Sequence, residues 1–151
     1  MPFLSHMGAA LEAARQAAAR GEVPVGAAVA DPAGRLVAVA SNRTRELHDP
    51  TAHAEILALR AACAAAGSER LPGYSLWVTL EPCPMCAAAI GLARIARLHF
   101  GAPDPKSGGV LHGPRLFTHP QLHHRPEIYP GIAEAEAAAL LRDFFASLRE
   151  S

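Results

Sequence analysis

Two short motifs that lie far apart in the chain constrain its fold more than any other feature. The first is His53-Ala54-Glu55, and the second is Pro82-Cys83-Pro84-Met85-Cys86. One imidazole and two thiols are ligands that zinc prefers, and a catalytic zinc takes three protein ligands and leaves one position for water. A chain that uses His53, Cys83 and Cys86 together must fold so that both motifs meet at one point.

The spacing inside each motif fits such a centre. Cys83 and Cys86 stand three positions apart, so on a helix both sulfurs point to the same side. Pro82 precedes them, which suits a helix start, where the dipole favours the thiolate form that binds metal. Glu55 lies two positions after His53 and is displaced around the helix from it. We therefore expect Glu55 to move protons between the attacking water and the leaving group without binding the metal.

Two other interpretations of the cysteine pair explain less of the sequence. A C-x-x-C pair can be a redox dithiol or half of a structural zinc site. A structural site needs a fourth ligand, and none follows Cys86 at the usual spacing. A redox pair leaves His53 and Glu55 unexplained. The order H-x-E followed by P-C-x-x-C resembles the signature of hydrolytic zinc deaminases, which favours a catalytic zinc.

Length and composition bound the class of protein. A chain of 151 residues suits one domain, so residues 1–151 are expected to form a single zinc-dependent deaminase domain. The sequence has no apolar run long enough to span a membrane and no signal-peptide pattern at its start. Three cysteines, two of them assigned to metal, favour a reducing, cytoplasmic setting over a disulfide framework. The 14 basic and 14 acidic residues balance, which gives no support for strong nonspecific nucleic-acid binding.

Hydrophobic periodicity predicts helices and strands that alternate along the chain. A helix capped by Asp49 or Thr51 is expected to carry His53 and Glu55 in its first turn and to end near residue 66. The other expected helices cover residues 4–20, 83–93 and 133–148, and the expected strands cover 25–30, 35–40, 74–80, 96–101 and 127–129. This order predicts a three-layer α/β/α domain with a mixed, roughly five-stranded sheet, and both metal-bearing helices are expected to begin at one edge of it.

Longer blocks around the two motifs carry a further signal. They comprise residues 21–27, 42–43, 48–60, 78–86, 94–95 and 100–102, with Asp104, Lys106 and the pair Phe144-Phe145. These blocks resemble the bacterial tRNA-specific adenosine deaminases, within the cytidine-deaminase-like superfamily. The resemblance implies a cytidine-deaminase-like fold, a homodimer, one Zn²⁺ per subunit, and hydrolysis of adenosine to inosine at the wobble position of a tRNA anticodon.

The resemblance also implies roles for residues beyond the metal ligands. Asn42 would hydrogen-bond the target nucleoside, and Val25 would line the base pocket. The backbone at Ala54 and the Pro82-Cys83 turn would hold the base and the water. The remaining residues, Asp104, Lys106 and Phe145, would lie near flanking nucleotides or beside the substrate cleft. Simpler roles stay open, because Val25 can be core, Asn42 and Asp104 can be turn residues, and Phe144 and Phe145 can divide between core and surface.

Three functions remain open from the sequence. The first is tRNA adenosine deamination, which the long matching blocks favour. The second is deamination of a free nucleobase or nucleoside, such as a cytosine, guanine or adenine derivative. It is favoured by the neutral charge and by departures from the family pattern at 109–117 and at His123-His124, in a Pro, Gly and His-rich stretch that spans 102–130. The third is a non-catalytic zinc-stabilised scaffold or RNA-binding subunit, against which Glu55 argues. The first is the favoured prediction.

Overall fold

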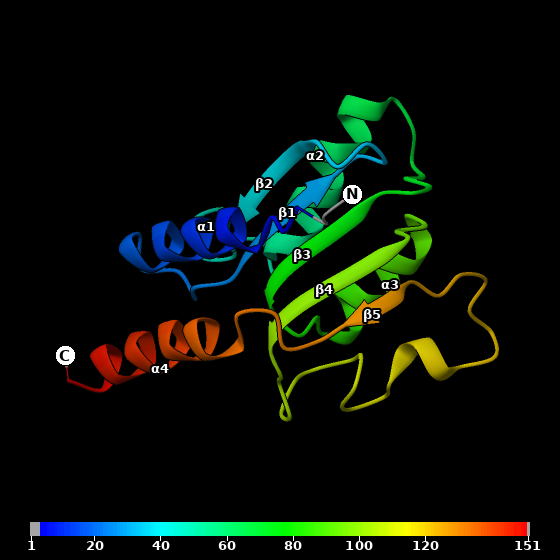
Figure 1. The fold of residues 1–151 in the computed structure, drawn as a ribbon. Helices are drawn as coiled ribbons and strands as arrows, with labels where there is room; N and C mark the ends of the chain where they lie inside the picture. The colour runs from blue at the N-terminus through cyan, green and yellow to red at the C-terminus, as the bar shows by residue number, and fades with distance from the viewer. Residues whose placement is uncertain (1–3, 151) are drawn as a thin grey trace.

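We describe the fold from a computed structural model, in which residues 4–150 are described (Figure 1). Helices alternate with strands in the order expected from the sequence. The helices are α1 (Met7–Ala19), α2 (Ala54–Ala66), α3 (Pro84–Leu92) and α4 (Glu134–Glu150), with one 3-10 turn, η1 (Leu116–Thr118). The strands are β1 (Gly26–Ala30), β2 (Leu36–Ser41), β3 (Ser75–Leu80), β4 (Arg97–Ala102) and β5 (Glu127–Tyr129).

The strands form one mixed sheet in the order β2-β1-β3-β4-β5. Strand β1 is antiparallel to both neighbours, whereas β3, β4 and β5 run parallel. The hairpin between β1 and β2 is closed by Asp31, whose Oδ1 accepts hydrogen bonds from the N–H groups of Ala33 and Arg35. The predicted five-stranded mixed sheet is confirmed, including the short strand at its edge.

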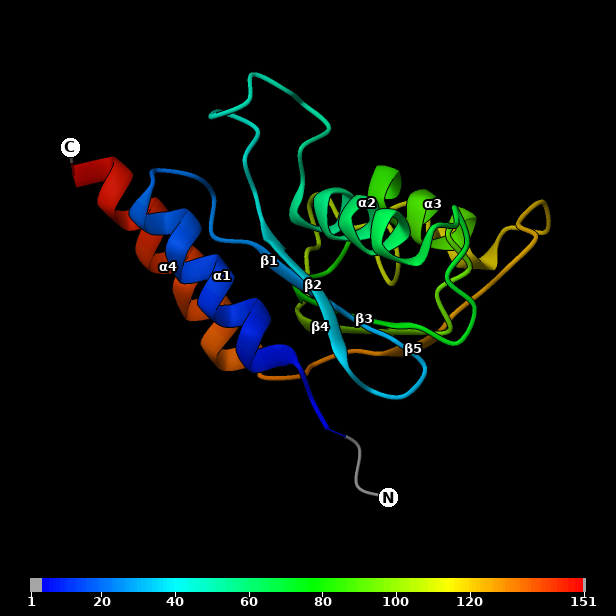
Figure 2. The ribbon, with the colours of Figure 1, turned by 90° about the horizontal axis from the view of Figure 1, so that it is seen from above.

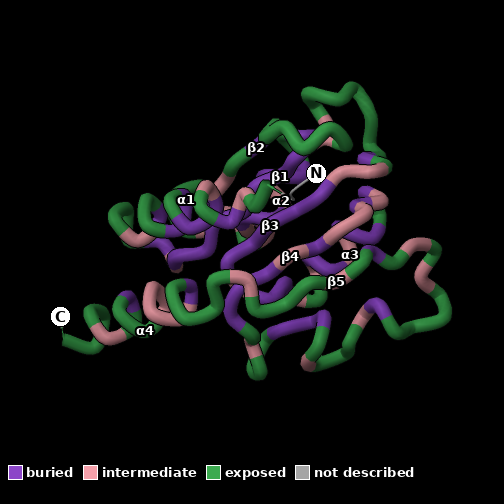
Figure 3. Tube along the Cα trace, in the orientation of Figure 1, coloured by how far each residue is buried: buried purple, intermediate pink, exposed green. Residues whose placement is uncertain are grey.

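Helices cover both faces of the sheet, which confirms the three-layer arrangement. Figure 2 shows α2 and α3 side by side on one face, with α1 and α4 together on the other. Strands β1 and β3 lie in the middle and are almost completely buried (Figure 3), as expected for strands covered on both sides. No helix within residues 4–150 is long and apolar enough to cross a membrane.

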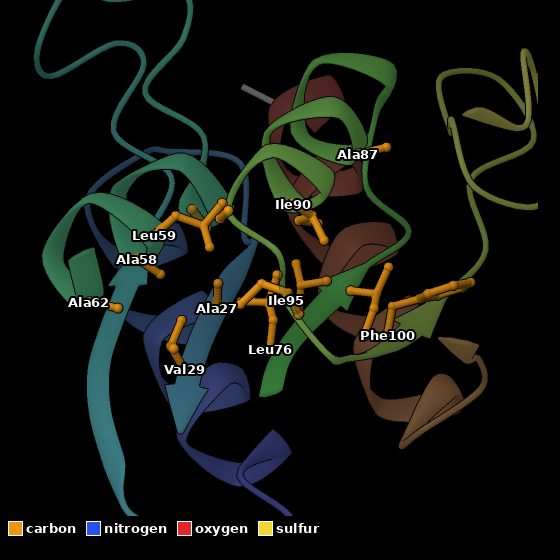
Figure 4. Close-up of a cluster of buried hydrophobic side chains, with 14 of the residues drawn as sticks. Ala27, Val29, Ala58, Leu59, Ala62, Leu76, Ala87, Ile90, Ile95 and Phe100 are labelled. Carbon is orange, nitrogen blue, oxygen red and sulfur yellow. The ribbon is translucent and has the colours of Figure 1, made fainter. Parts of the chain in front are cut away.

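The larger part of the core lies between the sheet and the pair α2 and α3. There Leu59 of α2 and Ile90 of α3 pack towards Leu76 and neighbouring strand residues (Figure 4). On the other face, Trp77 packs with α1 and α4 in a smaller cluster. Helix α1 approaches β1 so closely that a Cβ at Gly26 would overlap the backbone carbonyl of Ala10. These contacts fix α2 and α3 against the same face, with both N-termini at one edge.

The start of α2 corrects a prediction. Its N-cap residue is His53, and neither Asp49 nor Thr51 caps the helix. Instead, Asp49 Oδ1 accepts hydrogen bonds from the backbone N–H and the hydroxyl of Thr51, at 2.8 and 2.7 Å, and closes a separate turn. Pro50 disfavours a helical conformation at the residue before it, so the helix cannot begin there. Glu55 alone of the motif's polar residues lies inside the first turn.

The boundaries elsewhere differ from the predictions by a few residues. Helix α1 begins at Met7 rather than at residue 4, and α4 extends to Glu150. Cys83 is the N-cap residue of α3, and Pro84 occupies the first turn. The long stretch after β4 contains η1, which the sequence pattern did not predict, and Phe117 of η1 is buried in the core cluster.

Candidate active site

The three predicted metal ligands meet at the N-termini of two helices. His53 precedes α2, Cys83 precedes α3, and Cys86 lies in the first turn of α3. His53 Nδ1 is 3.6 Å from Cys83 Sγ and 3.5 Å from Cys86 Sγ. Among residues 4–150, these three form the one group of at least three His, Cys, Asp or Glu side chains whose ligand atoms lie within 4.8 Å of one another.

The geometry of this group fits a tetrahedral zinc. Zinc–sulfur bonds of about 2.3 Å and zinc–nitrogen bonds of about 2.0–2.1 Å, at a tetrahedral angle, place the nitrogen and a sulfur about 3.6 Å apart. The observed separations of 3.6 and 3.5 Å match this value. Three ligands from one imidazole and two thiols leave the fourth position open, as in catalytic rather than structural sites.

The two thiols differ in their protonation. A hydrogen bond from Cys86, supported by His53, lowers the pKa of Cys83 to about 4. The same hydrogen bond, together with burial, raises the pKa of Cys86. Because metal ligation requires the thiolate form, a bound metal ion takes the place of the proton that the two thiols share.

Glu55 lies beside this group and does not belong to it. It sits in the first turn of α2, where only 4% of the residue is exposed. Burial raises the pKa of its carboxyl to about 7. A carboxyl with a pKa near neutral can both accept and donate a proton at the pH of the cell. The structure thus places at this point a side chain suited to move protons.

A pocket of about 260 Å³ opens at the metal group. Most residues predicted for the site line it, and they come from five segments of the chain. The predicted residues in its wall are Val25, Asn42, His53, Ala54, Glu55, Cys83 and Asp104. Five further residues line it and were not predicted, although each lies within a few positions of a predicted residue: Val23, Thr44, Leu80, Glu81 and Ser107.

The other predicted residues lie nearby but outside this pocket. Lys106 and Phe145 line an adjacent groove of about 730 Å³, which shares Asp104 and Ser107 with the pocket. Pro82 is buried behind the pocket, and its carbonyl accepts a hydrogen bond from the Gly109 N–H at 2.8 Å. The groove lies between the loop after β4, which carries Lys106, and helix α4, which carries Phe145.

Segment 109–124, whose departures favoured another substrate, does not line the pocket. The pocket wall comes from residues 23–25, 42–44, 53–55, 80–83 and 104–107. Gly109 packs on the turn that bears Cys83, Val110 and Phe117 are buried in the core cluster, and most of the other residues of the segment are exposed. The departures in this segment therefore do not face a base in the pocket directly.

Asn42 has an unusual environment. Only 7% of this residue is exposed, and its N–H donates to the carbonyl of Val25. Its side-chain Oδ1 is buried without a hydrogen-bond partner, the one side-chain atom of this kind within residues 4–150. Because an unpaired buried acceptor costs about 1–3 kcal/mol, a ligand that donates to Oδ1 would recover that free energy.

Comparison with known proteins adds a second line of observation. The family model for the cytidine and deoxycytidylate deaminase zinc-binding region matches residues 4–102, which contain the three ligands. A tRNA-specific adenosine deaminase of Agrobacterium fabrum is 58% identical over 141 residues, which cover 93% of this chain and 91% of the relative. The matched zinc-binding region and the donor geometry together identify His53, Cys83 and Cys86 as the zinc ligands.

Solved structures show the same fold. One, from a study of A-to-I editing by tRNA:A34 deaminases at the wobble position, has a TM-score of 0.87 and 57% identity, and covers 89% of this chain and 97% of its own. A guanine deaminase of Nitrosomonas europaea has a TM-score of 0.80 and 28% identity, and covers 93% of this chain and 82% of its own.

Proposed function

The chain belongs to the family of tRNA-specific adenosine deaminases, and we propose from this that it converts adenosine to inosine at the wobble position of a tRNA anticodon. The observation that carries the proposal is the 58% identity over nearly the whole chain, against 28% for the guanine deaminase. Since the pocket wall lies almost wholly outside the divergent segment, the departures at 109–117 do not oppose it.

The reaction needs a nucleophile, and His53, Cys83 and Cys86 would hold a zinc ion that would supply it by lowering the pKa of a water molecule. Glu55 accepts the proton that this water loses when its oxygen attacks the adenine carbon that bears the amino group. Glu55 then returns a proton to the amino group, which leaves as ammonia. The carboxyl finishes each turnover in its starting state. Its pKa of about 7 suits a group that must both accept and donate a proton.

The pocket supplies groups that hold the nucleoside. Asn42 Oδ1 accepts a hydrogen bond from an N–H or O–H group of the target nucleotide, which satisfies the unpaired oxygen. Val25 and Ala54 form apolar walls against the base. The backbone of Ala54 and of the Pro82-Cys83 turn holds the base and the attacking water. The target base is unstacked from the anticodon loop to reach this depth.

The groove beside the pocket suits the nucleotides that flank the target. It is lined by Lys106 and Arg149, which can pair with phosphates, and by Phe145, whose ring is 43% exposed and can stack on a base. Phe144 is buried instead, so the pair divides between core and surface. Because pocket and groove share Asp104 and Ser107, one strand of RNA can occupy both.

Three wider expectations belong to the same proposal. The chain acts as one domain over residues 1–151, works in the cytoplasm where tRNA is found, and forms a homodimer. The family resemblance supports the dimer. Light scattering on the purified protein tests the dimer, and a monomeric mass at micromolar concentration would contradict it.

The decisive experiment measures the ammonia that zinc-loaded protein releases and the inosine that it forms in the substrate. An anticodon stem-loop with adenosine at the wobble position is compared with the free bases adenine, guanine and cytosine and with their nucleosides. Turnover of the stem-loop, with little or no turnover of the small molecules, is expected. Turnover of a free base with an inert stem-loop would overturn the proposal and favour the alternative of a nucleobase deaminase.

A further inference from the structure

Glu81 is a buried carboxylate to which neither the metal centre nor the proposed chemistry assigns a role. It follows β3 and precedes the turn that carries Cys83, and its side chain is fully buried. Its Oε1 accepts from the N–H of Asp104 at 3.0 Å and lies 2.7 Å from His112 Nδ1. Its Oε2 accepts from three successive backbone N–H groups, those of residues 110, 111 and 112, at 3.2, 2.9 and 3.0 Å.

This arrangement suits an ionised carboxylate, because both of its oxygens face hydrogen-bond donors. A buried charge is costly unless hydrogen bonds replace its hydration, and five donors surround the two oxygens of Glu81. The backbone N–H groups of Asp104, Leu111 and His112 take the place of the water that burial removes from the carboxylate. The side chain acts as a fixed negative anchor.

The anchored segment carries one wall of the substrate site. Glu81 binds both ends of it, at Asp104 and at His112. Within the segment, Asp104 Oδ1 accepts from the N–H groups of Lys106 and Ser107, at 3.2 and 3.0 Å. Asp104 and Ser107 line the pocket, and Lys106 lines the groove. The place of these three side chains therefore depends on the carboxylate of Glu81.

The segment lies directly on the turn that holds the metal ligand. The Gly109 N–H donates to the Pro82 carbonyl, and a Cβ at Gly109 would stand 2.6 Å from the nitrogen of Pro84. A Cβ at Gly108 would stand 2.5 Å from Glu81 Oε2. No side chain fits at either position unless the backbone moves, so the segment has a single place relative to the pocket.

The opposite wall is held by a similar device. Glu22 is 2% exposed, and its two oxygens accept from the N–H groups of Arg45 and Glu46 at 3.2 and 2.8 Å. These residues follow Asn42 and Thr44, which line the pocket from that side. Both loops that flank the pocket are thus fixed through backbone N–H groups by a buried glutamate, and the larger number of bonds is made by Glu81.

We propose that Glu81 is a positioning residue that fixes segment 104–112 against the turn bearing Cys83 and thereby sets the affinity for the nucleotides beside the target base. This inference rests on the proposed function, because it concerns the binding of an RNA strand. It predicts an effect on KM for the stem-loop that is larger than the effect on kcat, since the three zinc ligands and Glu55 all lie outside segment 104–112.

The test is the isosteric variant Glu81→Gln. Whichever way the new amide turns, its NH2 group faces backbone N–H donors, so the segment loses part of its anchor. We expect KM for the stem-loop to rise at least about tenfold, with kcat changed less than about threefold. Zinc content should stay at one per chain, and the amides of residues 110–112 should exchange hydrogen faster. Asp31→Asn is the matched control, because its carboxylate also accepts two backbone N–H bonds but lies in a hairpin away from the pocket.

Gly108→Ala gives a second variant that keeps the charge of Glu81, because its Cβ would overlap both Glu81 Oε2 and the Asp104 carbonyl and so push the segment away from the carboxylate. It should raise KM in the same way and keep its zinc. If the wild-type protein deaminates the stem-loop and either folded variant exchanges these amides faster with an unchanged KM, the inference is wrong. If Glu81→Gln and Asp31→Asn raise KM and lower kcat to the same extent as each other, Glu81 has only a general stabilising role and the inference is also wrong. A wild-type protein inert on the stem-loop would overturn the proposed function first.

Discussion

His53 Nδ1 lies 3.5 Å from Cys86 Sγ, although the two residues are 33 positions apart in the chain. Each stands at the start of a different helix, and the helices are held side by side because both bury apolar side chains against the same face of the sheet. The metal centre is therefore a product of the core. Anything that moves α2 relative to α3 moves one ligand away from the others.

Replacement of a metal ligand should remove the zinc. We expect Cys86→Ser to lower the zinc content to well under one per chain and to lower activity in proportion. The site has only three protein ligands, and the substitution replaces a soft thiolate by a hydroxyl that binds zinc poorly. Zinc is measured by elemental analysis after dialysis. Cys63→Ser is the control, since Cys63 lies within α2 away from the metal group and should keep both metal and activity. Full zinc retention by Cys86→Ser would contradict the ligand assignment.

Glu55→Gln should separate metal binding from turnover. The variant keeps the shape of the side chain but cannot carry a proton, so kcat should fall by about 10²- to 10⁴-fold while one zinc per chain is retained. Single-turnover inosine formation gives the rate. Glu69→Gln changes an exposed carboxylate just beyond α2 and should be silent. A Glu55→Gln enzyme with wild-type kcat would refute the proton-transfer role.

Asn42→Ala should weaken substrate binding. Loss of one buried hydrogen bond costs about 1–3 kcal/mol, which corresponds to a rise in KM of about 5- to 150-fold if the bond is made equally in the ground and transition states. The folded protein itself loses little, because Oδ1 has no partner in it. Steady-state kinetics on the stem-loop provide the comparison, with Gln121→Ala on the exposed surface as the matched amide. No change in KM or in kcat would show that the substrate does not use Oδ1.

Lys106→Ala should reduce the salt dependence of stem-loop turnover. Each phosphate contact contributes about 0.7–0.9 to the slope of log affinity against log salt concentration, so removal of one contact should lower the slope by about that amount. The slope is obtained from KM at several salt concentrations. Arg35→Ala removes a cation that is 82% exposed in the β1–β2 hairpin and should leave the slope unchanged. An equal slope in wild type and Lys106→Ala would place the phosphate elsewhere.

His99 should contribute to acid sensitivity. Its ring is half-buried and stacked between Trp77, at 4.4 Å, and Tyr129, at 4.9 Å, and burial lowers its pKa. The folded state thus binds a proton less readily than the unfolded state, whose pKa is about 6.5, so stability is present above that value and is lost as pH falls through the folded pKa.

His99→Phe keeps the stacked rings and removes this titration. The fall in urea midpoint below pH 6.5 should therefore be smaller than in the wild type. His123→Phe, at an exposed position in the loop before β5, is the comparison variant. The same pH dependence in His99→Phe and wild type would show that another group carries the acid sensitivity.

Much of the fold could be predicted because the patterns that specify it are local. The helical spacing of apolar residues in α1, the motifs at the starts of α2 and α3, and the short strand-like runs predicted the three layers and the mixed sheet, with boundaries a few residues off. The failures have local causes as well. Asp49 was expected to cap α2, but Pro50 and the Asp49–Thr51 hydrogen bonds favour a separate turn. The turn η1 escaped prediction because its three residues are too short for a periodic signal.

By itself the sequence determined the chemistry of the centre, because donor types and helical spacing are properties of neighbouring residues. It named His53, Cys83 and Cys86 as ligands, and it marked Glu55 as the free carboxylate beside them. Only the tertiary structure decided how the pocket around them is held. The partners of Glu81 lie 23 to 31 positions away, so its role depends on a segment that returns to it across the fold. Burial and unpaired atoms, such as Oδ1 of Asn42, likewise exist only once distant segments have packed together.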